Sequence, residues 1–264
     1  MGSPNFRFKQ FTVWHDKCAM KVGTDGVLLG AWCPIPNNFS TLNTLPYRLL
    51  DIGTGSGLIA LMLAQRLSCL YHTHQPTYHI DAIDIDSDAV AQAKENFALS
   101  PWTKHLRAHH STLQEWEPQT TNGEVSYDLI VSNPPYFQQS LKNPNTQRAT
   151  ARHTDTLKYS ELILHATRLL KPCGTLALVL PIEAEEDILG LSKEFGLYPT
   201  HITHVHSKPY KPAKRLLIAL SSILRSNEAS AHCPTLPIVN TFHIESSDSP
   251  RSEDYKKLTQ DFYL

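Results

Sequence analysis

Two kinds of hydrophobic pattern alternate along the chain. Short, nearly continuous apolar runs are typical of strands buried in a sheet, whereas longer segments with apolar residues three or four positions apart predict amphipathic helices. The expected strands are 48–52, 79–84, 105–110, 127–131, 175–180, 198–206 and 215–221. The expected helices are 27–32, 58–67, 88–99, 159–170 and 183–195. The Pro-, Asn- and Ser-rich stretch 34–46 predicts a surface linker between the first helix and the first strand.

This alternation of strands and helices predicts an α/β fold. Strands joined by helices form βαβ units, so the sheet should be mostly parallel and covered by helices on both faces. In such sheets ligands bind beyond the carboxyl ends of the strands. The turns that follow Ile52, Asp84, His110 and Ser132 are therefore the places where a site is expected.

Composition narrows the class of protein. The 264 residues are 41% hydrophobic, which suffices for one packed domain with modest appendages and excludes a mainly disordered chain. No apolar run reaches the roughly 18–20 residues of a membrane span, and the N-terminus does not resemble a signal peptide. The cysteines are odd in number (5) and form no Cys-x-x-Cys pair, so we expect a reducing, cytoplasmic environment and no membrane attachment.

A glycine-rich loop joins the strand 48–52 to the helix 58–67. It reads Asp51-Ile52-Gly53-Thr54-Gly55-Ser56-Gly57, and such glycines allow positive φ and close approach of a ligand to bare backbone. An ordinary tight turn is one interpretation. A nicotinamide dinucleotide site is another, but it requires Gly-x-Gly-x-x-Gly, and the third glycine here comes one residue too early. Asp51 is also badly placed for a pyrophosphate and suits a ligand with an amino group and no phosphate.

An acid, Asp84, ends the next strand, where a carboxylate can accept hydrogen bonds from both hydroxyls of a ribose. Its neighbour Asp86 is expected to cap the following helix. At this point residues 48 to about 221 resemble the class I S-adenosylmethionine-dependent methyltransferases, which carry Asp-x-Gly-x-Gly-x-Gly and an acid ending the second strand. The resemblance implies a Rossmann-like fold with a mostly parallel seven-stranded sheet, a final antiparallel strand and S-adenosyl-L-methionine as cofactor.

A second motif, Asn133-Pro134-Pro135-Tyr136, follows the strand 127–131. Two prolines commonly just end a strand, but this pair lies at the ligand edge of the sheet. The amino group of an adenine or a glutamine amide is a poor nucleophile because its lone pair is delocalised. The Asn133 side-chain oxygen and the Pro134 carbonyl can accept its two hydrogens and disfavour planarity during methyl transfer. Pro135 would hold the turn rigid, and Tyr136 would stack on the flat substrate.

The motif does not distinguish an adenine from a glutamine. Release-factor glutamine methyltransferases share it but usually place a sizeable helical domain before the glycine loop, whereas only 50 residues precede Asp51. The net charge of the chain is only −1, but three basic clusters flank the expected site. Together they favour a nucleic acid as substrate. For each cluster alone, an ordinary solvent-exposed charged face is the alternative. The clusters are residues 1–24, the group Lys142, Arg148, Arg152 and Lys158, and the group Lys208, Lys211, Lys214, Arg215 and Arg225.

Both ends of the chain are similar to one family, the bacterial tRNA1(Val) (adenine-N6)-methyltransferases. The similarity is carried by segments within 8–32, by 100–102, by 147–152 and by the closing 258–264. It implies methylation of adenosine 37, directly 3′ of the anticodon, in one valine tRNA. The alternatives are a release-factor glutamine, or an adenine of another RNA or of DNA. It also implies three parts: an extension and linker 1–46 that covers substrate and cofactor, a methyltransferase domain 47–222 and a C-terminal appendage 223–264.

These motifs and clusters give a set of candidate residues. The catalytic candidates are Asn133, Pro134, Pro135 and Tyr136. The cofactor-binding candidates are Thr24, Asp51, Gly53, Gly55, Gly57, Asp84, Thr112 and Asn133. The RNA-binding candidates are Lys21, Arg148, Arg152, Lys211, Lys214 and Arg215, with Arg148 and Arg152 the strongest.

One position departs from the family. Where the family tends to carry Ala-Asp-Ile against the cofactor adenine, this chain has Ser111-Thr112-Leu113, so Thr112 would offer its hydroxyl and backbone N–H. The stretch 226–250 also matches the family poorly and is expected to be loop.

Other classes of site have less support. His204 and His206 share one face of a predicted strand, but no third ligand follows at suitable spacing, so no metal is expected. A pure binding module would need neither Asp84 nor Asn133, and both are present. No obligatory protein partner is evident.

Overall fold

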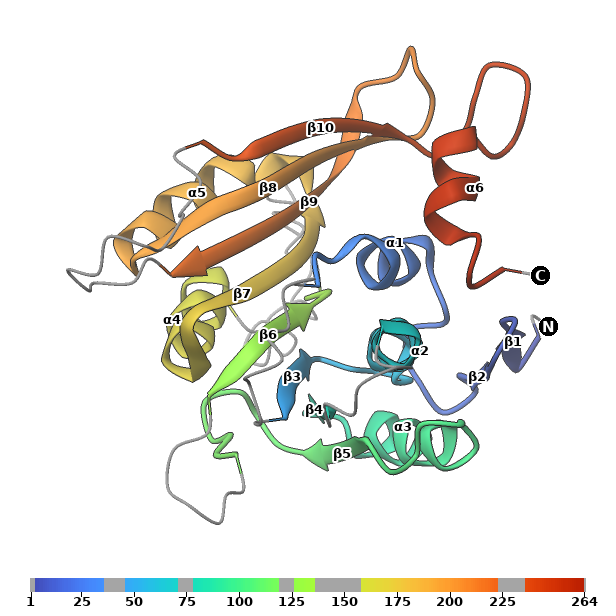
Figure 1. Cartoon of the computed structure of the whole chain (residues 1–264), viewed down its shortest axis with the longest axis vertical. Helices are drawn as coiled ribbons and strands as arrows, with labels where there is room; N and C mark the ends of the chain where they lie inside the picture. Colours follow the sequence, from blue (N-terminus) through green and yellow to red (C-terminus); the bar gives the residue numbers. More distant parts are fainter. Residues whose placement is uncertain are drawn as a thin grey trace, which may run out of the picture.

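The computed structural model describes residues 3–35, 46–70, 78–118, 126–135, 158–222 and 236–263. Within them, 8 strands form one sheet in the order β10-β8-β9-β7-β6-β3-β4-β5 (Figure 1). Neighbouring strands run parallel except at β9, which is antiparallel to both β7 and β8. The strands are β3 (Tyr47–Ile52), β4 (Tyr78–Asp84), β5 (Leu106–His110), β6 (Tyr127–Ser132), β7 (Leu170–Pro181), β8 (Leu197–His206), β9 (Ala213–Ser222) and β10 (Ile238–His243).

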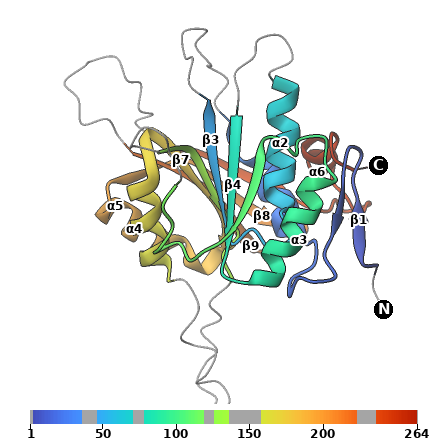
Figure 2. The same ribbon diagram turned by 90° about the horizontal axis from the view of Figure 1, so that it is seen from below.

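Helices cover both faces of this sheet (Figure 2). One face packs against α1 (Thr24–Trp32), α2 (Leu58–Leu70) and α3 (Ser87–Ala98). The other packs against α4 (Tyr159–Leu169) and α5 (Glu185–Glu194), which follows the single turn η1 (Ile182–Ala184). Strands with helices on both sides are apolar along most of their length, which is why β3, β6 and β7 appear in the sequence as short continuous apolar runs. The expected α/β fold with a mostly parallel sheet is confirmed.

Every expected strand and helix is present, and most ends agree within a few residues. Four elements were not expected: the strands β1 (Asn5–Arg7) and β2 (Thr12–Trp14), the strand β10 and the helix α6 (Glu253–Thr259). The expectation of loop over 226–250 is therefore wrong at β10, which pairs in parallel with β8. With β10 the main sheet has 8 strands, whereas seven were expected. The first four residues of β10 are all exposed, so no alternation of apolar and polar residues marks it.

The two ends of the chain lie together beside α2 (Figure 1). The Lys9 backbone N–H donates to the Phe262 carbonyl at 2.8 Å, and the Gln65 side chain donates to the Asp261 carbonyl at 2.8 Å. The Phe8 ring stacks on Tyr263 with centroids 5.9 Å apart. The family-like closing segment thus fastens the N-terminal hairpin to the domain. The division into 1–46, 47–222 and 223–264 stays a prediction, and β10 of the last part extends the sheet of the second.

Candidate functional site

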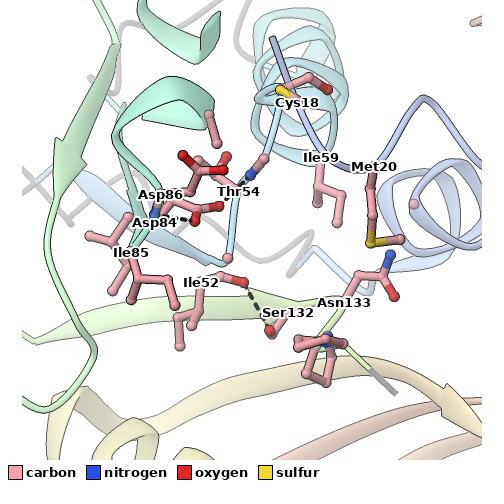
Figure 3. A pocket seen from close by; sticks show the side chains of 18 of the residues that line it. Cys18, Met20, Ile52, Thr54, Ile59, Asp84, Ile85, Asp86, Ser132 and Asn133 are labelled. Atoms are coloured by element: carbon pink, nitrogen blue, oxygen red, sulfur yellow. Dashed lines mark hydrogen bonds between the residues drawn. The ribbon is translucent and has the colours of Figure 1, made fainter. Parts of the chain in front are cut away.

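A cavity of about 1060 Å³ lies at the carboxyl ends of β3, β4 and β6, the edge that the topology indicated (Figure 3). One wall consists of the glycine loop after β3 and the turns after β4 and β5. The opposite wall consists of residues 18–26, which we call the cover segment, together with Arg215 at the start of β9. The turn after β6 lies between the two walls. A cavity of this size can hold a nucleoside-sized ligand with a second flat group beside it.

The three glycines of the loop serve two purposes. All have positive φ, at +68° for Gly53, +54° for Gly55 and +81° for Gly57. A Cβ added at Gly53 or Gly55 would meet nothing within 4 Å, so this stretch of backbone is bare. A Cβ at Gly57 would lie 2.5 Å from the Phe97 ring of α3. Gly53 and Gly55 therefore leave room for a ligand, whereas Gly57 leaves room for a helix.

Asp51 shapes the loop from behind. It is fully buried, and it is not among the residues that line the cavity. Its Oδ2 accepts hydrogen bonds from the Thr54 hydroxyl at 2.7 Å and the Ala60 backbone N–H at 3.2 Å. Burial raises the pKa of Asp51 to about 7, although these two donors oppose the shift. Its Oδ1 is buried and has no hydrogen-bond partner among the described residues.

Asp84 lies in the cavity wall, and a backbone N–H holds each of its carboxylate oxygens. Its Oδ2 accepts from the Gly55 backbone N–H at 2.8 Å and its Oδ1 from the Asp86 backbone N–H at 3.0 Å. Each carboxylate oxygen has a second lone pair, so both can still accept a hydroxyl. Asp86 accepts from the Asp88 N–H at 2.9 Å, which confirms that it caps α3.

The turn after β6 is tied to the glycine loop. The buried Ser132 hydroxyl donates to the Ile52 carbonyl at 2.8 Å, so the ends of β6 and β3 are linked directly (Figure 3). Asn133, Pro134 and Pro135 line the cavity next to this link. Tyr136 lies outside the described residues.

The cover segment is held by side chains that lie outside it, one near and one far along the chain. The Arg215 guanidinium donates to the Asp25 carboxylate at 2.9 Å, across 190 positions of sequence. The Val22 backbone N–H reaches His15 Nδ1 at 3.5 Å. Lys21 and Thr24 both line the cavity and are exposed. Arg215 forms this ion pair in the cavity wall, and its expected contact with an RNA phosphate stays a prediction.

The remaining candidates fall in three places. Thr112 lines the cavity, but its hydroxyl donates to the Glu115 carboxylate at 3.0 Å and accepts from the Glu115 N–H at 3.2 Å, so it is already engaged. Lys211 lies in the turn between β8 and β9 and Lys214 near the start of β9, and neither lines the cavity. Arg148 and Arg152 lie outside the described residues.

Several lining residues were missed from the sequence. Met20, Asp25 and Ser132 carry no motif of their own, and Figure 3 draws Met20 at the same end of the cavity as Asn133. Gln114 and Glu161 come from separate elements and meet at the rim, where the Gln114 amide donates to the Glu161 carboxylate at 2.9 Å. Only Ser132 had a usable signal, because a hydroxyl directly before the turn can fasten it to a neighbouring strand.

The described residues also bear on a metal site and on a membrane span. Among the described residues, no group of three His, Cys, Asp or Glu side chains could hold a metal ion. His204 is instead paired with Glu185 at 3.0 Å. No helix in these ranges is both long enough and apolar enough to cross a membrane.

Comparisons with known proteins show the family and the fold. Residues 39–204 match the model of the methyltransferase small domain family. A relative from Parabacteroides distasonis, named tRNA1(Val) (adenine(37)-N6)-methyltransferase, is 47% identical over 100% of this chain and 99% of its own length. A protein of the same name from Bacteroides fragilis is 44% identical over the same shares of the two chains. A crystal structure described as "a predicted O-methyltransferase" from Agrobacterium tumefaciens superimposes with a TM-score of 0.58 at 14% identity, covering 90% of this chain and 96% of the other. That likeness shows the fold alone.

Proposed function

Because the chain belongs to the methyltransferase small domain family, we propose that it methylates the exocyclic N6 of adenosine 37 in tRNA1(Val), with S-adenosyl-L-methionine as methyl donor. Relatives that carry this name match the chain over its full length. The observation that carries the proposal is the shared cavity: the Asn133-Pro134-Pro135 turn opens into the same space as the glycine loop and Asp84. A nucleoside-containing donor and a flat acceptor can therefore meet there.

The residues of the loop wall fit the proposed donor. When bound, it supplies an electrophilic methyl group on a sulfonium. The bare backbone of Gly53 and Gly55 admits the ligand closely, and Asp84 is proposed to accept its ribose hydroxyls. The free Oδ1 of Asp51 suits an amino group, which would favour the charged form of a carboxylate that burial otherwise disfavours. Thr112 is proposed to contribute its backbone N–H rather than its hydroxyl.

The turn after β6 is proposed to activate the target nitrogen. The Asn133 side-chain oxygen and the Pro134 carbonyl accept the two hydrogens of the amino group, which disfavours its planar form as the nitrogen attacks. The Ser132–Ile52 hydrogen bond holds this turn at a fixed distance from the glycine loop, and such positioning lowers the barrier further. The proton can leave to water after methyl transfer, so the reaction needs no strong base.

An anticodon-loop adenosine must be splayed out before it can enter a cavity, and its phosphates must be held meanwhile. Tyr136 is proposed to stack on the base. Lys21, at the cavity rim, and Arg148 and Arg152, after the turn, are proposed to contact phosphates. Arg215 is proposed to hold the cover segment through Asp25.

The test uses the purified protein, labelled S-adenosyl-L-methionine and total tRNA from a strain that lacks the activity. We expect label in N6-methyladenosine after digestion of the tRNA. Purified tRNA1(Val) with guanosine in place of adenosine 37 is the matched control and should stay unlabelled. Label in a release-factor glutamine, or equal label in both tRNAs, would overturn the proposal.

A further inference from the structure

The turn between β8 and β9 rises from the same edge of the sheet as the cavity. Arg215 on β9 pairs with Pro181, the last residue of β7, and also lines the cavity. The residues just before Arg215 therefore continue outward from the cavity rim. In Figure 1 this segment is the orange turn that projects beyond the sheet between β8 and β9. We call residues 207–214 the basic hairpin.

The basic hairpin displays an aromatic ring among cations. Tyr210 is 71% exposed at its tip and lies between Pro209 and Pro212, which restrict the backbone. Lys211 and Lys214 are exposed and form no ion pair with any residue that the structure describes. Lys208 pairs with Glu245 at 3.4 Å, and this contact, with a smaller one from Tyr210, raises the pKa of Lys208. A solvent-facing ring flanked by free ammonium groups is typical of surfaces that bind single-stranded nucleic acid.

The hairpin is held in shape before any partner arrives. The Lys211 N–H donates to the Lys208 carbonyl at 3.1 Å, and the Lys211 carbonyl lies 2.7 Å from His206 Nδ1. The segment after β10 braces it, since the Glu245 N–H donates to the Ser207 carbonyl at 3.0 Å. The pairing register shifts by one residue at Lys214, which is the extra residue of a β-bulge. Little ordering is therefore left to be done on binding, which favours affinity.

We infer that the basic hairpin is a second docking point for the RNA, separate from the cavity. Tyr210 stacks on an unpaired base beside the target nucleotide, while Lys211 and Lys214 neutralise phosphates. The inference rests on the proposed function, because the hairpin ends directly before Arg215, which lines the cavity proposed to hold the target nucleotide. An acidic peptide could satisfy the cations but would give the exposed ring no flat partner, so RNA is favoured.

Filter binding of tRNA1(Val) at several salt concentrations tests the inference without turnover. Tyr210→Ala should weaken binding about ten-fold, the scale of one lost base–aromatic stack, and Tyr210→Phe should stay within about two-fold because the ring remains. Lys211→Ala and Lys214→Ala should each reduce the salt slope by roughly 0.7–0.9. Affinity for S-adenosyl-L-methionine, measured by calorimetry, should not change in any of the four variants.

Two matched controls lie at the opposite edge of the sheet. Tyr198 is 41% exposed near the start of β8, and Lys104 is exposed in the turn before β5. Tyr198→Ala and Lys104→Ala should bind tRNA as the wild type does. If Tyr210→Ala and Tyr198→Ala bind tRNA1(Val) equally well, the hairpin inference is overturned. The proposed function still stands in that case if the wild type methylates tRNA. If the wild type binds tRNA through the hairpin but methylates none, only the proposed function fails. If Tyr210→Ala, Lys211→Ala and Lys214→Ala weaken the binding of an acidic protein as much as they weaken the binding of tRNA1(Val), the hairpin binds a protein partner. That result would overturn the inference.

Discussion

The two walls of the cavity are built in different ways. The loop wall is held by contacts between neighbouring strand ends: the Gly53 N–H donates to the Ile83 carbonyl at 2.9 Å, and the Gly55 N–H to Asp84. The cover wall is held by side chains that are remote in sequence, as in the Asp25–Arg215 pair. Trp32, at the far end of the helix α1 that begins within the cover segment, likewise donates to the Thr203 hydroxyl of β8 at 3.1 Å. The loop wall is therefore set by the sheet itself. The cover wall is anchored by the buried face of α1 and joined to β9 by the Asp25–Arg215 pair, a polar contact that can be altered while the domain stays folded.

The largest effect is expected between the two walls, at Asn133. Asn133→Ala removes one acceptor of the target amino group, so kcat for tRNA methylation should fall by about 10²–10³. The loop wall stays intact, so affinity for S-adenosyl-L-methionine should change little. Single-turnover rates at saturating tRNA check the loss of rate. Calorimetry of the same preparation checks the affinity for S-adenosyl-L-methionine. A rate within a few-fold of wild type would remove Asn133 from the chemistry.

Gly57 and Gly55 separate folding from binding within the loop wall. Both have positive φ, so alanine strains the backbone at either position by about 1 kcal/mol or more. At Gly57 the new methyl also overlaps the Phe97 ring, so unfolding free energy should fall by roughly 2–3 kcal/mol in total. Gly55→Ala should lose only the strain, but its methyl should lower the affinity for S-adenosyl-L-methionine. Urea unfolding and calorimetry measure the two quantities.

Phe97→Leu supplies the control for this pair. Added to Gly57→Ala it should recover part of the lost stability, because the smaller side chain makes room for the methyl. Added to Gly55→Ala it should recover nothing. Equal unfolding free energies for the two alanine variants would contradict the division of roles between these glycines.

The contrast between the walls also explains what the sequence could reveal. The loop wall is local: Asp51 to Gly57 and Asp84 are read directly from strand ends and turns. Met20 and Asp25 of the cover wall have no local pattern, because their place depends on partners such as Arg215 far along the chain. β10 could not be predicted for the same reason. Its exposed residues show no alternation of apolar and polar positions, and its pairing with β8 joins segments that are distant in the sequence. Asp51 shows the limit within the loop itself, since the motif does not reveal that this carboxyl is buried behind the loop and is not among the residues that line the cavity.

The buried carboxyl of Asp51 should make the stability of the loop wall depend on pH. Its pKa is raised to about 7 by burial, so the unfolded chain releases this proton near its ordinary pKa of 3.8 while the folded chain keeps it. The contribution of Asp51 is therefore fully present at low pH and is lost as pH rises towards about 7. Between about pH 5 and about pH 6 the wild type should lose roughly 1 kcal/mol relative to Asp51→Asn.

Urea unfolding of the wild type and of Asp51→Asn at both pH values gives this difference in unfolding free energy. The contributions of groups that titrate in both proteins cancel in the comparison. Saturating S-adenosyl-L-methionine should flatten the slope of the wild type, since an amino group beside Oδ1 favours the carboxylate. Parallel stability curves for the two proteins would show that the carboxyl is ionised in the folded chain.

The smallest effect on stability, and the sharpest test of the cover wall, is expected at Asp25 and Arg215. Their side chains are 23% and 33% exposed, so solvent screens the pair and a double-mutant cycle should give a coupling free energy below about 1 kcal/mol. The effect on substrate should be larger, because a displaced cover segment moves Lys21 and Thr24: KM for tRNA should rise several-fold in Asp25→Ala and Arg215→Ala alike, with little change in kcat. The exchanged pair Asp25→Arg with Arg215→Asp should recover part of the loss. If Arg215 contacts a phosphate instead, Arg215→Ala alone would flatten the salt dependence of tRNA binding, Asp25→Ala would leave it unchanged, and the exchange would recover nothing.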